Sequence, residues 1–441
     1  MTVGEAWVWL AVSVGLPVAA LLLVLVAGRL AGGLHMTTRV FAAAHSLTLG
    51  VGSTTIVGAA YQMSSALLGA RLWGERIIPW QLGIYLAGAG SLVAGFWYGS
   101  FVLLAWGGSL VAAAAWVYVA IMLRTAGRLR RRTGPPASRQ GRPQWVHALA
   151  MALATVNFGL VTTWGLVLAL SMRYPLWPGL WAGHRGLVVH LALGLGGWFA
   201  LMVVGVSYRL VPIVHGARIA SQPRGLAVVA LVTGAVLLAV TGALGRHGWA
   251  LRLAAALIAP AGALYVWELA RLLQHRRRRA PDLNVSHWWA VMGYTLVLAA
   301  MGLGWAAGLV GPEHGERLGV LAAVLFLAGW VVQAILGQLY KVTPFLMWYY
   351  RAFIPDVLQI SRLPDLYAPR PGRLAFWLTN AGVVLMGYGI ARADGGWATA
   401  GAVLLAAGCG LVAWMLGYSW IPGVVAGRLP FRWRHTEGAS A

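Results

Sequence analysis

The chain has 441 residues, of which 60% are hydrophobic and only 10% are charged, against a charged share of roughly 25% in soluble domains. This composition excludes an ordinary soluble protein and indicates a chain embedded in a lipid bilayer. The formal charge of +23 does not indicate nucleic-acid binding, because the basic residues lie between apolar runs and are not interleaved with aromatic residues. The single cysteine, Cys409, excludes an internal disulfide framework, a thiolate metal cluster and a CxxCH haem attachment.

Twelve apolar runs are long enough to cross a hydrocarbon core of about 30 Å at about 1.5 Å per residue. They lie at 7–27, 40–63, 79–98, 101–123, 146–172, 187–211, 226–244, 251–273, 288–310, 318–340, 374–390 and 398–417. The first run exceeds the hydrophobic region of a signal peptide and no small-residue cleavage site follows it, so we expect it to be retained. The sequence therefore predicts an all-α membrane protein of about twelve transmembrane helices, with a tight turn at 96–100.

The basic residues predict the orientation of these helices. With the N-terminus inside, 25 of the 33 Arg and Lys residues fall on cytoplasmic segments and 8 on external ones. This bias follows the positive-inside rule. An error in the helix count would exchange the cytoplasmic and external sides of every later segment and remove the bias. We therefore expect a multi-pass protein of the cell inner (plasma) membrane with both termini in the cytoplasm, ending in a basic tail at 426–441.

Two helices end on a related pattern. Gly205 to Pro212 and Gly337 to Pro344 share Gly, Tyr, a basic residue, an aliphatic residue and Pro at one spacing, with an offset of 132 residues. The second helix shares only the Gly and the Tyr, as Gly58 and Tyr61, with an offset of 147 residues to the sixth. Close packing at glycine and interfacial anchoring by the other residues is one interpretation. The other is a single membrane domain, 1–441, built from three parallel repeats of four helices, approximately 1–130, 131–280 and 281–425.

The eleven histidines divide by depth. Nine lie in loops or at helix ends, where we expect hydrogen bonds to water or lipid headgroups: His35, His147, His184, His215, His247, His275, His287, His314 and His435. His45 and His190 lie within the second and sixth helices, about 5 to 8 Å below the outer boundary at nearly matched depth. An ionisable group within a span is a functional candidate, although a neutral imidazole hydrogen-bonded to a neighbouring helix is the alternative.

Glycines follow both histidines along their helices, which leaves room for a bulky planar ligand. Two imidazoles at one depth beside glycine-rich surface favour a haem, with His45 and His190 as its axial ligands. Arg39 and Arg185 lie just outside them and are candidates to receive the haem propionates, or to anchor the membrane interface. Glu268 is the only acidic residue within the predicted spans, so classical proton pumping is not expected.

At these residues the sequence resembles the haem-copper oxidase subunit I superfamily, whose plan is twelve helices in three four-helix arcs. His190-Leu191-Ala192, followed by Gly197, Gly205 and Tyr208, resembles the family's H-x-H helix, and Ala44-His45-Ser46 resembles the segment with the other low-spin ligand. Ala192 replaces the second histidine, no adjacent His-His pair exists, and the predicted tenth helix has no histidine. The chain is thus more similar to ligand-poor relatives such as the NnrS-type membrane proteins, which bind haem and copper and act in nitric-oxide stress.

The resemblance implies a membrane protein that binds a b-type haem and serves electron transfer or a nitric-oxide- or oxygen-related role, without a complete haem-copper reduction site. Oxidoreductase activity of the haem-copper oxidase type, an electron donor and a partner subunit are left open. Copper is also left open, with His35, Met36 and His184 as candidate ligands. The alternative is a transporter or accessory membrane subunit that keeps the oxidase scaffold without redox chemistry.

Overall fold

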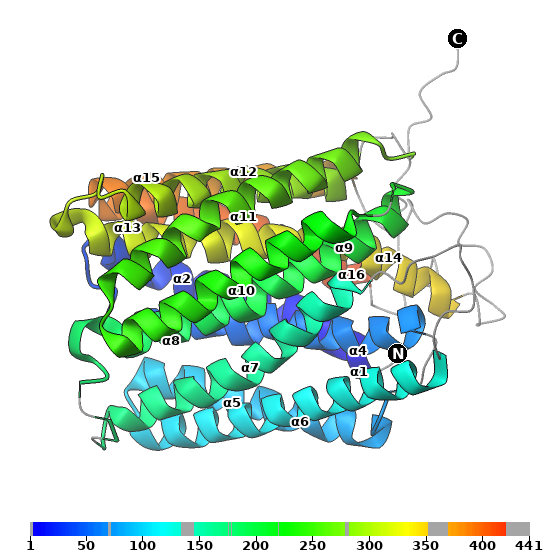
Figure 1. The fold of residues 1–441 in the computed structure, drawn as a ribbon, viewed down its shortest axis with the longest axis horizontal. Helices are drawn as coiled ribbons and strands as arrows, with labels where there is room; N and C mark the ends of the chain where they lie inside the picture. Colours follow the sequence, from blue (N-terminus) through cyan, green and yellow to red (C-terminus); the bar gives the residue numbers. More distant parts are fainter. Residues whose placement is uncertain are drawn as a thin grey trace, which may run out of the picture.

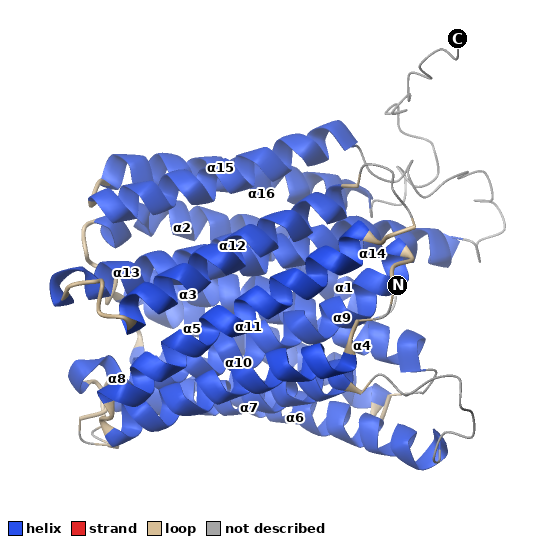
Figure 2. Cartoon of the chain, turned by 45° about the horizontal axis from the view of Figure 1, so that its top comes forward, coloured by secondary structure: helices blue, strands red, loops and turns tan. Residues whose placement is uncertain are grey.

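The fold is described here from a computed structural model. It describes residues 3–68, 72–133, 145–277 except 175, 178 and 219, 282–351, and 369–419. The described part of the chain is helical and contains no strand (Figure 2). Twelve of its helices are long and apolar enough to cross a membrane, which confirms the number of spans predicted from the sequence.

Several spans are composite, because short segments of π-helix interrupt the α-helix. The first four spans are α1 (Val3–Leu10) with η1 (Ala11–Gly15) and α2 (Leu16–Ala31), α3 (Thr38–His45) with η2 (Ser46–Ser53) and α4 (Thr54–Leu68), α5 (Ile78–Tyr98), and α6 (Phe101–Thr133). The next four are α7 (Val146–Ser171), α8 (Arg185–Leu191) with η5 (Ala192–Ala200) and α9 (Leu201–His215), α10 (Gln222–Gly245), and α11 (Gly248–Gln274). The last four are α12 (Leu283–Ala306), α13 (Pro312–Val324) with η6 (Leu325–Val331) and α14 (Val332–Arg351), α15 (Pro369–Arg392), and α16 (Gly395–Ser419).

The turn predicted at 96–100 is present. Gly99 follows α5 with a positive φ of 70°, which glycine adopts without steric cost. The amide of Ser100 donates to the carbonyl of Gly95 at 2.9 Å, and α6 begins at the next residue. Helix α6 then continues to Thr133 instead of ending near residue 123, so the run Arg128 to Arg132 prolongs the helix beyond its apolar part.

The spans form one bundle in which neighbours along the chain pack as hairpins (Figure 1). The pairs α5–α6, α10–α11 and α15–α16 are such hairpins, and α16 packs against α2, which brings the last span to the first. We call the end at which α3, α8 and α13 begin the entry end, and the end at which α4, α9 and α14 finish the exit end. Helix α1 begins at the exit end and α16 finishes there (Figure 1). The predicted tail, 426–441, lies outside the described residues.

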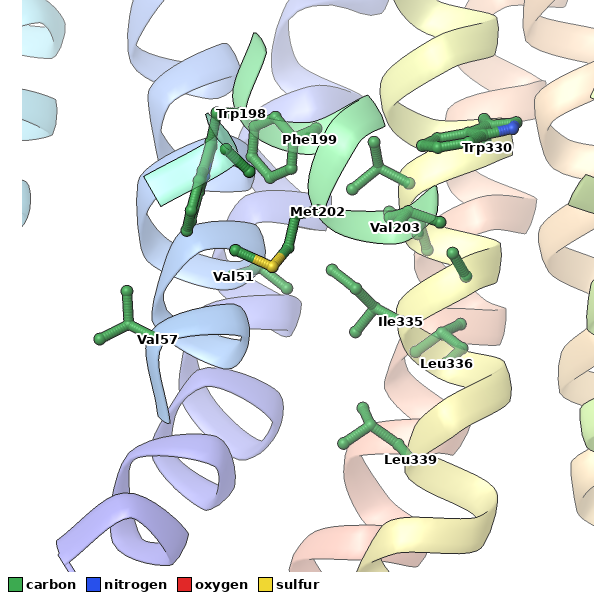
Figure 3. Close-up of a cluster of buried hydrophobic side chains, with 14 of the residues drawn as sticks. Val51, Val57, Trp198, Phe199, Met202, Val203, Trp330, Ile335, Leu336 and Leu339 are labelled. Carbon is green, nitrogen blue, oxygen red and sulfur yellow. The ribbon is translucent and has the colours of Figure 1, made fainter. Parts of the chain in front are cut away.

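The second, sixth and tenth spans share a backbone feature that the sequence analysis did not predict. Each contains a π-helical segment in its entry half: η2, η5 and η6. A π-helical turn takes one more residue than an α-helical turn, and such segments are frequent at functional sites. At these segments and below them the three spans meet in a shared core that includes Val51, Met202, Trp330 and Ile335 (Figure 3). The second, sixth and tenth spans therefore pack together inside the bundle.

Candidate functional site

His45 is the last residue of α3, directly before η2. Its Nδ1 lies 2.8 Å from the carbonyl oxygen of Phe41, one turn earlier. Because a carbonyl only accepts, Nδ1 must carry the proton, which leaves Nε2 with a free lone pair. The ring stacks on Phe96 of α5 with centroids 5.1 Å apart, so its orientation is fixed on both sides. A histidine held in this way is prepared to bind a metal through Nε2.

His190 lies in α8, two residues before η5 begins. Its Nδ1 is buried and has no hydrogen-bond partner among the described residues. Gly165 of α7 lies against the ring, since a Cβ built there would be 2.9 Å from Cε1 of His190. The position of this imidazole thus depends on the absence of a side chain at residue 165.

The fold brings the two histidines together. Their ring centroids are 6.0 Å apart, with an angle of 34° between the planes. The ring centres of two imidazoles bound to one iron would stand about 6.2 Å apart, taking ~2 Å for each metal–nitrogen bond and ~1.1 Å from that nitrogen to the ring centre. The observed separation is therefore close to that of an axial pair. The matched depth of the two histidines in the membrane stays a prediction, and the sequence contained no signal for the rotation of either helix.

Both imidazoles line one cavity of about 490 Å³, within the range of about 300–1,000 Å³ of ligand and cofactor sites. Its walls are almost wholly apolar, and Phe96, Phe158 and Trp198 supply aromatic surface. Trp198 and Phe158 stack at 4.4 Å, and the indole N–H of Trp198 donates to Ser53 Oγ at 2.9 Å. These aromatic side chains of the cavity wall are thus themselves held in place.

Toward the entry end the same cavity is lined by His35, Met36 and His184, the candidate copper ligands. His35 Nδ1 lies 3.0 Å from the carbonyl of Gly33. The described residues contain no group of three His, Cys, Asp or Glu side chains placed to hold a metal ion. The three candidates therefore share a cavity wall, and copper binding stays a prediction.

The two candidate propionate partners do not line this cavity. Arg39 is exposed, and its guanidinium lies over the ring of Trp97 at 5.5 Å. Arg185 is half-buried in the first turn of α8, at the entry end. The contact with Trp97 is typical of an interfacial anchor, so contact with a propionate would require Arg39 to move.

Two histidines that we expected at the water interface are buried instead. His215 is 1% exposed, and its Nε2 lies 2.7 Å from Asn284 Oδ1. His287 is 1% exposed, its Nδ1 lies 2.5 Å from Gln333 Oε1, and its Nε2 has no partner in the described structure. The expectation that these two histidines bond to water or lipid headgroups is therefore wrong. Position along the sequence gave no signal, because both side chains turn inward toward neighbouring spans.

The tenth span also begins earlier than predicted. Helix α13 starts at Pro312, so it includes His314 in its first turn. That side chain is exposed and pairs with Glu313 at 3.0 Å. His314 does not line the cavity, and the described part of the tenth span offers no inward histidine to the site.

Glu268 is buried and paired with an arginine. Its carboxylate accepts from Arg224 Nε at 2.6 Å and from the backbone amide of Ser221 at 2.7 Å, at the exit end of the bundle. The carboxylate is 3% exposed. This pairing fixes α11 to the start of α10.

The twelve apolar helices and the internal cavity define a multi-pass α-helical membrane protein. The chain matches no protein-family model, and no curated protein is significantly similar to it in sequence.

Proposed function

We propose that the chain is a haem-binding membrane protein in which His45 and His190 are the two axial ligands of one b-type haem. The observation that carries this proposal is the 6.0 Å separation of two imidazoles from different helices on the wall of one apolar cavity. The free Nε2 of His45 and the unpartnered Nδ1 of His190 support it, because neither ring is satisfied by protein contacts alone.

A haem with two imidazole ligands supplies one-electron redox chemistry when bound. The protein's part is to hold the ligands and exclude water. The Phe41 carbonyl fixes the tautomer of His45, and Gly165 leaves space for the ring of His190. The apolar walls favour an electron-transfer or nitric-oxide-linked role. Among the described residues no histidine of the tenth span lines the cavity and no three-ligand metal group is present, which argues against a complete haem-copper site.

We also propose that the chain consists of three parallel four-helix repeats, as in the haem-copper oxidase plan. Three of the four π-helical segments in the described residues support this. Segments η2, η5 and η6 begin at Ser46, Ala192 and Leu325, within one residue of the offsets 147 and 132 of the sequence pattern, whereas η1 lies in the first span. The offset of 132 also relates Trp198 to Trp330, which lie in η5 and η6.

Packing at the exit end provides independent support for the repeat. A Cβ at Gly225 would lie 3.0 Å from Val146 and 3.1 Å from Tyr208, and one at Gly372 would meet Leu283 and, at 3.4 Å, Tyr340. In both four-helix units, a glycine near the start of the third helix packs on a tyrosine of the second helix. The same glycine also packs on the first residue of the first helix. The same three-way contact in two units favours a common origin over a chance Gly-x-x-Tyr match.

The visible spectrum of the purified protein tests the haem proposal. We expect sharp reduced-minus-oxidised bands of a low-spin haem, lost or converted in His45→Ala and in His190→Ala, because one missing imidazole leaves a five-coordinate or water-bound iron. His275→Ala is the matched control, since His275 is exposed and bonds only to its own helix through the carbonyl of Arg271. Protein purified with haem supplied, yet without bound haem, would contradict the proposal and favour a transporter or accessory subunit.

A further inference from the structure

A second cavity, of about 240 Å³, lies in the exit half of the bundle and has no part in the proposed haem site. Its walls come from the first, second, fourth, fifth, sixth, ninth and tenth spans and are largely apolar. Arg209 of α9 and His147 of α7 also line it, and no Asp or Glu does. The cavity thus combines apolar walls with one permanent positive charge.

Arg209 is half-buried, about 9 Å from the end of α9 at 1.5 Å per residue, and has no carboxylate partner among the described residues. Two other basic side chains at this end are paired with carboxylates. Arg224 bonds to Glu268, and Lys341 bonds to Asp282. An unpaired cation within a membrane span is costly, so an anion that enters the cavity would relieve that cost.

The second and third four-helix units differ in a way that explains why Arg209 has no carboxylate partner among the described residues. Arg209 and Lys341 follow the tyrosines of the repeated pattern, and Val146 and Leu283 occupy equivalent positions beside the glycines that contact those tyrosines. The residue before Leu283 is Asp282, which neutralises Lys341. The residue before Val146 is Trp145, which has no charge. The second unit therefore keeps the cation and lacks the carboxylate.

Two further residues on the cavity wall have unsatisfied donors. The Thr55 hydroxyl and the Trp288 indole N–H are buried and have no hydrogen-bond partner within the described part of the chain. Thr55 is 6% exposed and Trp288 is 2% exposed. Leaving such groups unpaired in an apolar interior is unfavourable, and both can donate to an anion or to water that accompanies it.

We propose that this cavity binds an anionic amphiphile, a single acyl chain with a carboxylate or phosphate head. Arg209 holds the head, with His147 beside it, and the apolar walls hold the chain. Basic pockets between membrane helices bind anionic lipid headgroups in this manner. A bound lipid or fatty acid would contact α4, α9 and α14, because all three helices contribute to the cavity wall. It would therefore contribute to the packing of these helices against one another.

The test measures binding to the full-length protein in non-ionic detergent, with oleate and a lysophosphatidic acid as the two head chemistries. Acetate supplies a head without a chain, and oleyl alcohol a chain without a charge. We expect oleate or the lysolipid to bind at least tenfold more tightly than either control. Only these two probes use both the positive charge of Arg209 and the apolar walls. The tighter of the two identifies the source as free fatty acid or membrane phospholipid.

Three variants locate the site. Arg209→Gln should weaken binding of the tighter probe by about tenfold or more, the loss typical of a charge-assisted contact, and Arg218→Gln, which alters an exposed arginine at the same end, should not. Trp145→Asp should weaken binding similarly without lowering thermal stability, because it introduces the carboxylate that Asp282 provides in the other unit. Affinities within twofold across wild type, Arg209→Gln and Trp145→Asp, or oleyl alcohol binding as tightly as oleate, would overturn the proposal.

Discussion

Gly165 lies against the imidazole of His190, close enough that even a methyl group at residue 165 would have to displace the ring. The two residues come from α7 and α8, so the position of the imidazole is set by the packing of one span against the next. A substitution at Gly165 therefore tests the haem site without removing a ligand.

We predict that Gly165→Ala will retain the fold but shift or broaden the low-spin haem bands and lower haem occupancy. The physical reason is that His190 must tilt away from the new Cβ, which changes the iron–imidazole geometry. Gly83→Ala is the control, because a Cβ there meets nothing within 4 Å. Identical spectra and haem content in the two variants would show that the position of His190 does not matter to the cofactor.

We predict that the entry end faces outward, as the positive-inside bias indicates. Single cysteines test this in the native background, because Cys409 is 2% exposed and should not react. Tyr174→Cys, at an exposed position of the entry end, should be labelled by an impermeant maleimide in intact cells, and Gln274→Cys, at an exposed position of the exit end, only after permeabilisation. The reverse pattern would invert the topology.

We predict that purified, haem-loaded protein will not sustain oxygen reduction with an artificial electron donor. The reason is structural: the only histidine in the described tenth span, His314, is exposed at its tip, and the described residues form no three-ligand metal group. An oxygen electrode measures this directly. Sustained uptake that disappears in His190→Ala would show that a reduction site exists.

We predict that Gln333→Leu will lower the stability of the protein by about 1 kcal/mol, the magnitude of interhelical hydrogen bonds in membranes. Gln333 joins His287 of α12 to Thr379 of α15, with its Nε2 3.2 Å from Thr379 Oγ1, so the variant leaves the His287 N–H unpaired. Thermal unfolding in detergent measures the loss.

Thr241→Val provides the comparison for that measurement, because the Thr241 hydroxyl bonds only within its own helix. If Gln333→Leu and Thr241→Val unfold at the same temperature as the wild type, the hydrogen bonds of Gln333 with His287 and Thr379 do not stabilise the bundle. A double variant with His287→Ala should lose less than the two single losses combined, since both act on one hydrogen bond.

The sequence by itself determined the twelve spans, because the cost of leaving a backbone polar group or a charge in lipid forces each crossing to be a helix of mostly apolar residues. Hydropathy also placed His45 and His190 within spans, but it assigned His215 and His287 to the water interface, where the structure shows both side chains buried. It located the turn at Gly99, since the chain between two spans is too short for any other connection. These features depend on distance along the chain alone.

Only the tertiary structure decided which side chains meet. That His45 faces His190, that His287 turns toward Gln333, and that Lys341 has a carboxylate where Arg209 has none all depend on helix rotation and on which spans become neighbours. In lipid that choice is made by close packing at glycines and by interhelical hydrogen bonds, not by hydrophobicity, because lipid is as apolar as the helix surface. The π-helical segments rotate each helix further at the site, and no pattern in the sequence predicted where they begin.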